Sequence, residues 1–320
     1  MRVRLSLLMA LAAFVLPAPF AVAQEKFPSR AIEIIVPFAA GASTDLGMRV
    51  LAPALEAKWG VPVRVIDKPG GNTVPAVNEV MTAKPDGYTI LADGPPQSSM
   101  LDTAVKNLPF KVTDRTFIAV AAYTPMMLLV PADSPLKTLA DAAAAAKADP
   151  SSFVWTSLGG AGAPDMAFRQ FFKAIGVDVT KTRPLQLKGA SEAVTMTAGG
   201  HVKMGVGSYA ALSAALQAGK LRVLATAGPE RWPNQPDIPT TKEVGFPAVE
   251  TLYWIGFSGP PGLPADIVAI WDKAIKEVLT EPTVQEGLLR VGMKAIYEDA
   301  ATMAQRVARE RAETQELWSR

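Results

Sequence analysis

Short apolar stretches alternate with amphipathic stretches along most of this chain, and the two patterns predict strands that are followed by helices. The predicted strands are rich in Val, Ile and Leu, and they span residues 32–36, 63–66, 88–92, 153–156, 183–187, 202–206 and 221–227. The predicted helices span residues 43–58, 74–83, 136–148, 265–279 and 299–318, and three more begin at Ala163, Ala190 and Tyr209. This alternation predicts an α/β fold with a mixed, mostly parallel sheet flanked by helices.

The start of the chain has the pattern of an export signal. Arg2 and Arg4 precede an apolar run over residues 5–16, and Ala21-Val22-Ala23 has the small-x-small spacing that signal peptidase cleaves. The apolar run is shorter than the roughly 20 residues that a membrane-spanning helix needs. We therefore expect residues 1–23 to be a signal peptide that is cleaved after Ala23.

The composition argues against several classes of protein. The chain has 32 basic and 30 acidic side chains, and Arg2 and Arg4 lie in the signal peptide, so the mature chain carries equal numbers of both. A mature chain with this balance lacks the excess of basic side chains that is typical of proteins that bind nucleic acid or an anionic membrane. The chain has no cysteine, so burial alone has to stabilise it. Its length predicts about two domains of about 100 to 200 residues each.

A loop of small residues joins the first predicted strand to the first predicted helix. Ligands of parallel sheets lie beyond the carboxyl ends of the strands, where small residues let a ligand approach the main chain closely. Free N–H groups at the helix start favour an anion by about 0.3 to 2 kcal/mol. The loop therefore fits a cradle for a carboxylate, although tight packing alone would also explain its composition. Its residues are Phe38, Ala39, Ala40, Gly41, Ala42, Ser43, Thr44 and Asp45.

Two later strand-to-helix junctions have the same character. They read SLGGAGAPD at residues 157–165 and KGASEA at residues 188–193. If the three loops converge across a cleft, they can hold a ligand from both sides. The glycine spacings of dinucleotide-binding and nucleotide triphosphate-binding loops are absent. Candidate ligand-binding residues in these two loops are Ser157, Gly160, Ala161, Gly162, Ala163, Asp165, Gly189, Ala190 and Ser191.

Polar and aromatic residues elsewhere give further candidates. Gln97 and Ser98 follow the third predicted strand, where their side chains can bind a ligand or stabilise a turn. Tyr253, Trp254 and Phe257 fit a hydrophobic core, and they also fit an aromatic wall of the site, which would suit an aromatic carboxylate.

The candidates for catalysis are few. His201 is the only histidine, so a catalytic Ser-His pair would have to include it. We expect a structural or surface role for His201 instead. Asp93 with Asp102 could act as acid and base, and Lys188 could form a Schiff base only if desolvated. Ordinary solvated or capping roles explain these residues better. Zinc sites built from His and Cys and clustered calcium ligands are not found. We therefore expect no enzyme activity, no metal and no cofactor.

Seven motifs, in order along nearly the entire mature chain, resemble the substrate-binding receptors of tripartite tricarboxylate transporters, the Bug-type family. Each motif is modest alone, and their order together is highly specific. They are FPSRAIEIIVPFAAGASTD (27–45), KPGGN (68–72), KPDGYTIL (84–91), KGASEAVTMTAGGHV (188–202), AGKLRVLA (218–225), PDIPTTKEVGFP (236–247) and PPGLPADIV (260–268).

The resemblance implies a two-lobed periplasmic binding protein of type II, the Venus flytrap fold, in which the chain crosses between the lobes twice. Lobe 1 would comprise residues 27–125 plus 227–320, and lobe 2 would comprise residues 126–226. Family members bind a carboxylate largely through main-chain groups and ordered water, using the first strand-to-helix loop and a loop of the other lobe. Ser208, which follows Gly205-Val206-Gly207, is a further candidate.

The resemblance also implies a cellular role. A monomer in the periplasm would capture a small organic carboxylate by closure of the lobes and deliver it to a membrane permease. The alternatives are a receptor that presents its ligand to a membrane kinase and, less favoured, an enzyme acting on a carboxylic acid.

Three positions depart from the family pattern. Gly41-Ala42 replaces a usual pair of glycines, Asp165 stands where Ser-His is frequent, and Gly200-His201-Val202-Lys203 replaces the usual GQVD. These departures leave the identity of the acid open.

Overall fold

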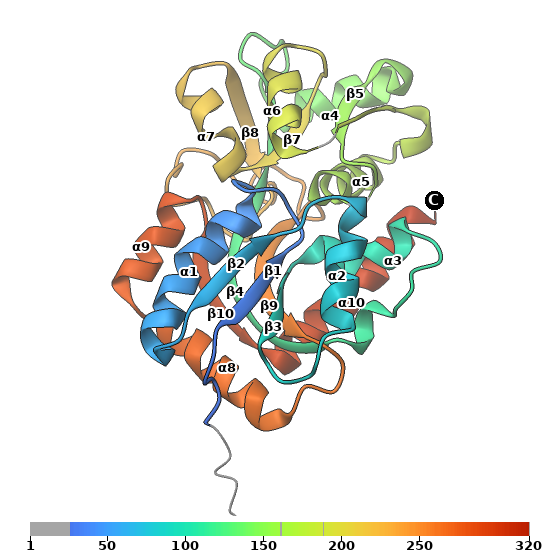
Figure 1. Ribbon diagram of the computed structural model, residues 1–320. Helices are drawn as coiled ribbons and strands as arrows, with labels where there is room; N and C mark the ends of the chain where they lie inside the picture. Colours follow the sequence, from blue (N-terminus) through green and yellow to red (C-terminus); the bar gives the residue numbers. More distant parts are fainter. Residues whose placement is uncertain (1–25, 161, 188, 320) are drawn as a thin grey trace, which may run out of the picture.

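The computed structural model describes residues 26–160, 162–187 and 189–319. The predicted signal peptide and the predicted roles of Ala161 and Lys188 therefore lie outside the described residues. The chain forms two lobes that are joined by extended strands (Figure 1). This confirms the predicted two-lobed α/β fold. Within the described part of the chain, no helix is both long enough and apolar enough to cross a membrane.

Lobe 1 is built on a mixed sheet. Its strands are β1 (Ile32–Val36), β2 (Val63–Asp67), β3 (Thr89–Asp93), β9 (Leu252–Gly259), β10 (Lys294–Asp299) and the first part of β4 (Thr116–Pro131), in the order β10-β4-β9-β3-β1-β2. Only β1 with β2 and β1 with β3 pair in parallel, whereas the β3–β9, β4–β9 and β4–β10 pairs are antiparallel. The sheet is mixed, as predicted, but it is not mostly parallel. Its parallel part is limited to β1, β2 and β3, because β4 leaves the lobe and β9 returns to it in the opposite direction.

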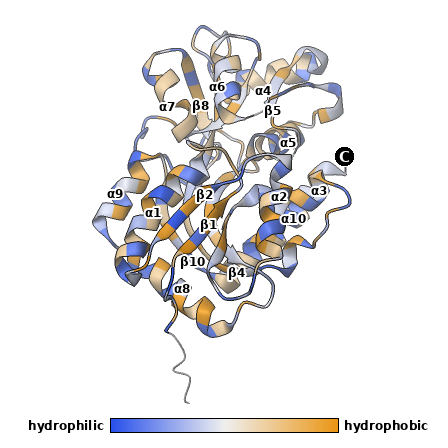
Figure 2. Cartoon of the chain, viewed as in Figure 1, coloured by the Kyte–Doolittle hydropathy of each residue, from blue (hydrophilic) through white to orange (hydrophobic). Residues whose placement is uncertain are grey.

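Helices cover both faces of this sheet (Figure 1). A large buried cluster joins one face to α1 (Ser43–Trp59), α8 (Ala265–Val278) and α9 (Pro282–Arg290). A smaller cluster joins the other face to α2 (Val74–Met81). The last helix, α10 (Ala300–Trp318), packs against β4 and β10. Figure 2 shows hydrophobic residues concentrated along β1 in the interior of this lobe.

Strand β4 carries the chain from lobe 1 into lobe 2. Pro125 still pairs with Leu252 of β9, whereas Met126 already pairs with Ser208 of β7 (Gly205–Ser208). Lobe 2 also contains β8 (Leu221–Thr226), antiparallel to β4, and the parallel pair of β5 (Val154–Ser157) and β6 (Arg183–Gln186). Its main helices are α4 (Leu139–Ala148), α5 (Ala163–Ile175), α6 (Ala190–Ala198) and α7 (Tyr209–Gln217).

The segment that follows β8 packs on lobe 2 before the chain returns. Val244, Phe246 and Val249 contact the buried cluster of lobe 2, and the ring of Phe246 lies 5.9 Å from that of Phe171 in α5. Thr251 then donates its N–H to Ala227 and accepts from Met126, directly before β9 begins. The boundaries 27–125 plus 227–320 and 126–226 stay a prediction, and this packing favours a second crossing near Thr251.

Candidate functional site

The loop after β1 presents its main chain at the start of α1. Gly41 has φ +82°, and its N–H donates to the Asp45 Oδ2 atom at 2.7 Å, which fixes the turn. Ala39, Ala40 and Gly41 are exposed, and no side chain caps α1, whose N-cap residue is Ala42. The first N–H groups of a helix have no partner within the helix. This end of α1 therefore carries main-chain N–H groups without an acceptor in the helix, directly after an exposed loop of small residues.

An arginine offsets the acidic charge beside this loop. Arg49 Nε lies 2.6 Å from Asp45 Oδ1, and Arg49 Nη2 lies 2.8 Å from Asp67 Oδ2 at the end of β2. Burial, followed by the nearby Asp45 carboxylate, raises the pKa of Asp67. Because Arg49 bridges the two carboxylates, their charge is partly neutralised near the donors of α1. The Asp45 carboxylate thus holds the conformation of the loop that precedes α1.

The start of α7 in lobe 2 meets the start of α1. Ser43 Oγ and Ser208 Oγ are 3.1 Å apart, and Ser208 is the N-cap residue of α7, which also has no side-chain cap. A helix N-terminus carries about half a positive charge, so two such ends that face each other repel. An anion between them would be attracted by both. Of all the predicted site residues, Ser43 and Ser208 are the pair that a hydrogen bond brings together from opposite lobes.

Tyr253 lies between the lobes behind this junction. Its hydroxyl is 2.8 Å from Thr44 Oγ1, and its ring packs against the buried clusters of both lobes. Burial raises its pKa, so the phenol stays neutral. Trp254 and Phe257 are fully buried in the core. Among the three aromatic candidates, Tyr253 is therefore the one that contacts a predicted site residue through a hydrogen bond.

The loop after β5 is organised around its own carboxylate. Asp165 accepts from Ser157 Oγ at 2.5 Å and from the N–H groups of Leu158, Gly160 and Gly162 at 3.0 to 3.2 Å. Burial raises the pKa of Asp165, and the four donors oppose that shift. These N–H groups are therefore used within the loop. Its contribution to a site would come from its shape and not from those donors.

The other predicted lobe 2 residues lie at helix starts. Ala163 is buried in the first turn of α5, next to Gly162. Gly189 is the N-cap residue of α6, where Ala190 is half-buried and Ser191 is exposed. Among the described residues, no side chain caps α6. In lobe 1, Phe38 is half-buried and packs against the core of that lobe.

Gln97 and Ser98 belong to a buried helical turn, Pro96–Met100, instead of an open loop. Ser98 Oγ donates to Asp93 Oδ1 at 2.7 Å, and the fully buried Arg115 pairs with the same carboxylate at 3.1 Å. Ser98 is thus part of a buried ion-pair cluster. The Gln97 side chain is also fully buried, and its amide has no hydrogen-bond partner among the described residues. Gln97 therefore retains the capacity to bind a polar group.

Among the residues considered for catalysis, Asp93, Asp102 and His201 have separate surroundings, and Lys188 lies outside the described residues. Asp93 pairs with Arg115, whereas Asp102 pairs with Arg311 of α10, and His201 is exposed. Over the ranges that the structure describes, no three His, Asp or Glu side chains form a group that would hold a metal ion. Asp93 and Asp102 are therefore each paired with a different arginine.

Glu310 of α10 supports the turn that carries Gln97. It accepts from Ser99 Oγ at 2.6 Å and from Trp254 Nε1 at 3.0 Å, and burial raises its pKa above 4.5. The folded protein therefore binds a proton at Glu310 more tightly than the unfolded chain does, so stability decreases as the pH rises between these two pKa values. We expect Glu310→Gln to remove this decrease. Urea unfolding of both proteins from about pH 4.5 to about pH 7 checks it, and parallel pH profiles would contradict it.

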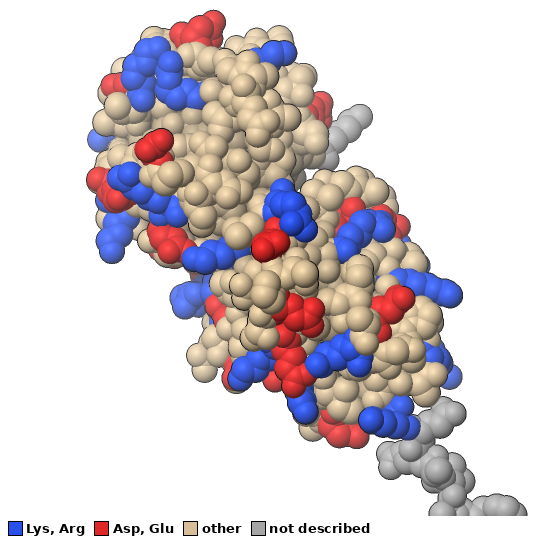
Figure 3. Space-filling view, turned by 90° about the vertical axis from the view of Figure 1, so that its left-hand side faces the viewer, with Lys and Arg blue, Asp and Glu red and all other residues tan. Residues whose placement is uncertain are grey.

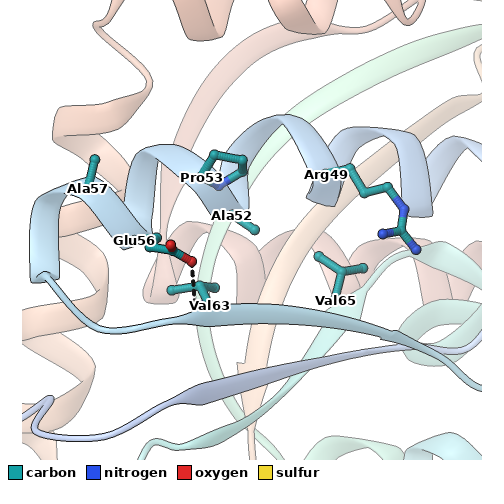
Figure 4. Close-up of a pocket in the computed structure, with 7 residues that line it drawn as sticks. All are labelled: Arg49, Ala52, Pro53, Glu56, Ala57, Val63 and Val65. Atoms are coloured by element: carbon teal, nitrogen blue, oxygen red, sulfur yellow. Dashed lines mark hydrogen bonds between the residues drawn. The ribbon is translucent and has the colours of Figure 1, made fainter.

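Two surface hollows lie elsewhere. One, of about 450 Å³, runs between α1 and β2, where Arg49 and Glu56 lie beside Val63 and Val65 (Figure 4). The other, of about 550 Å³, lies between α4, the end of α5 and residues 245–248. Neither contains a predicted site residue. On the face seen in Figure 3, basic and acidic side chains are interspersed, without a large patch of one sign.

Comparison with known proteins identifies the family. The chain is 33% identical over 281 residues to the UPF0065 protein in gbd 5'region of Cupriavidus necator, covering 88% of this chain and 84% of that one. The structure of the periplasmic binding protein BugD matches with a TM-score of 0.78 and 25% identity, covering 92% and 98% of the two chains. MatC from Rhodopseudomonas palustris, solved with bound malate, matches with a TM-score of 0.80 and 24% identity, covering 91% and 100%. The model of the tripartite tricarboxylate transporter family receptor matches residues 48–319. The chain belongs to this receptor family.

Proposed function

We propose that this receptor captures a small organic mono- or dicarboxylate between its two lobes in the periplasm and delivers it to a tripartite tricarboxylate-type permease. The observation that carries the proposal is the contact of Ser43 with Ser208, which sets the uncapped starts of α1 and α7 against each other. A carboxylate at this junction would accept main-chain N–H groups from both lobes. The malate bound to MatC, a protein of the same fold, agrees with this class of ligand.

The proposed site combines donors with residues that shape their surroundings. The starts of α1 and α7 provide the donors, Tyr253 lies beside α1 through its contact with Thr44, and Asp45 and Asp165 hold the loops before α1 and α5. We further propose that the start of α6 and the side chain of Gln97 face the same ligand. A ligand drives closure only if it binds the closed form better than the open form. Donors from two lobes meet that condition, because both sets reach the ligand only when the lobes are together. We further propose a monomer and cleavage after Ala23.

Isothermal titration with L-malate, adipate, benzoate and the uncharged diamide of malate tests the ligand class. At least one acid is expected to bind with a micromolar dissociation constant, about −8 kcal/mol, and the diamide is expected not to bind. Binding of the diamide as tightly as malate would contradict a site for an anion. Transport assays in membranes that contain or lack the permease would then test delivery.

Asp45→Ala is expected to weaken binding of the acid that titrates best by about tenfold, because Gly41 N–H loses its acceptor and the loop loses its shape. The matched control is Asp45→Asn, whose amide oxygen can still accept from Gly41. We expect the asparagine variant to bind within about threefold of the wild type. Equal affinity of all three proteins in calorimetry would show that this turn does not shape the site.

A further inference from the structure

The last helix, α10, is attached to lobe 1 along its first turns. Met303 and Val307 are buried in a cluster with Val120 of β4 and Trp254 of β9. Glu310 then accepts from Ser99 and Trp254, and Arg311 pairs with Asp102. The helix therefore moves with lobe 1, and in particular with the turn that carries Gln97.

The last two turns of α10 contact α5 in lobe 2 instead. Arg169 Nη1 donates to the Leu317 carbonyl oxygen at 2.8 Å, and the Arg169 guanidinium lies 4.3 Å from the centre of the Trp318 ring. Gln170 Nε2 donates to Glu313 Oε1 at 2.7 Å. These contacts join the two lobes in addition to the chain crossings at β4 and near Thr251 and the contact between Ser43 and Ser208.

Gln170 places this contact beside one of the crossings. Its amide also donates to the carbonyl oxygen of Glu250 and accepts from Thr251 Oγ1. Gln170 is only 5% exposed, and these hydrogen bonds give both polar atoms of its side chain a partner within the protein. One buried amide thus binds α5, the crossing segment and α10 together.

The end of α10 also makes an apolar contact and approaches the loop from Ser157 to Gly162. Leu317 and Trp318 pack with Met100 of lobe 1 and Met166 of α5. The indole Nε1 of Trp318 lies 3.7 Å from the position that a Cβ atom would take on Gly160. The end of α10 therefore reaches the loop that Asp165 organises.

We propose that the end of α10, residues 313–318, is a further link between the lobes that restrains their opening, with Arg169 as its main positioning residue. Lys173 also pairs with Glu316 at 2.9 Å, but both side chains are substantially exposed, and such pairs contribute little. Arg169 is half-buried and combines a charge-assisted hydrogen bond with a ring contact, which are the stronger kinds of interaction. The effect on ligand release rests on the proposed function, whereas the link itself does not.

Distance measurement by electron paramagnetic resonance tests the link without any ligand. Because the chain has no cysteine, nitroxides can be placed uniquely at Ala57→Cys in α1 and Ala144→Cys in α4, both exposed. The parent protein is expected to give one main distance. Arg169→Ala is expected to raise the ratio of longer to shorter distances by about tenfold, and Arg169→Lys should restore most of the short distance.

Two further variants make the result decisive. Gln315→Ala changes an exposed side chain on the same turns of α10 and is expected to leave the distances unchanged. Trp318→Ala removes the ring contact while the Arg169 side chain stays, and it should lengthen the distances as Arg169→Ala does. Distances in the Arg169 and Trp318 variants equal to those of Gln315→Ala would overturn the proposal. If the distances change but no acid binds in calorimetry, the link stands and the proposed ligand class fails.

Discussion

Asp165→Ala is expected to lower the free energy of unfolding by about 3 kcal/mol and to abolish ligand capture. The carboxylate accepts from one hydroxyl and three main-chain N–H groups, and all of these lie in the loop from Ser157 to Gly162. A buried donor that loses its acceptor costs about 1 to 3 kcal/mol. Part of this cost is recovered when the loop opens to water, but the loop then loses the shape that we propose for the wall of the site. Urea unfolding and calorimetry measure the two effects.

Asp141→Ala is the matched control for Asp165→Ala. Asp141 takes the same position in its helix, and it accepts from the N–H groups of Lys137 and Thr138 at the start of α4. It is exposed and belongs to no predicted site loop. We expect a smaller loss of stability and unchanged ligand affinity. Equal effects of the two variants on affinity would show that the Asp165 loop has no special part in capture.

Gly292→Ala is expected to weaken ligand binding by at least about tenfold because it would hold the lobes apart. Gly292 follows α9 in lobe 1 with φ +78°, and a Cβ atom there would lie 2.8 Å from the main-chain nitrogen of Ala210 in the first turn of α7. Real Cβ atoms do not approach so closely, so the helix start would have to withdraw. The donors of α7 would then move away from those of α1.

A control is needed because alanine is also strained at positive φ. Gly60 has φ +70° at the end of α1, and no atom lies within 4 Å of the Cβ position. Gly60→Ala therefore introduces similar backbone strain, about 1 to 2 kcal/mol, without a contact between the lobes. We expect both variants to lose similar stability and only Gly292→Ala to lose affinity. Affinity that falls equally in both would contradict a role for close approach of the lobes.

The sequence predicted best those elements whose hydrophobic pattern fits only one kind of secondary structure. The strand predicted at residues 32–36 and the helix starting at Ser43 occur as expected, and so do the helices starting at Ala163, Ala190 and Tyr209. The strands β4, β9 and β10 and the helix α9 were not predicted. The long β4 is apolar on both faces, so it has no alternation from which a strand can be recognised.

The loops of the proposed site could be recognised from the sequence, but their contacts with distant segments could not. Local composition identified the bare turn at Ala39 to Ala42, because a turn without bulky side chains is visible in the sequence. The same composition suggested that the loop after β5 donates to a ligand, whereas Asp165 occupies its donors. Gly292 and Arg169 could not be found, because their roles depend on contacts between segments that are far apart in the chain.

A crystal structure of the protein with the acid that binds best tests the central claim most directly. We expect a carboxylate oxygen within about 3 Å of main-chain nitrogen atoms at the start of α1, from Ser43 to Asp45, with the start of α7 on its other side. An acid bound in the hollow between α1 and β2, or one held only by side chains away from both helix starts, would contradict the account.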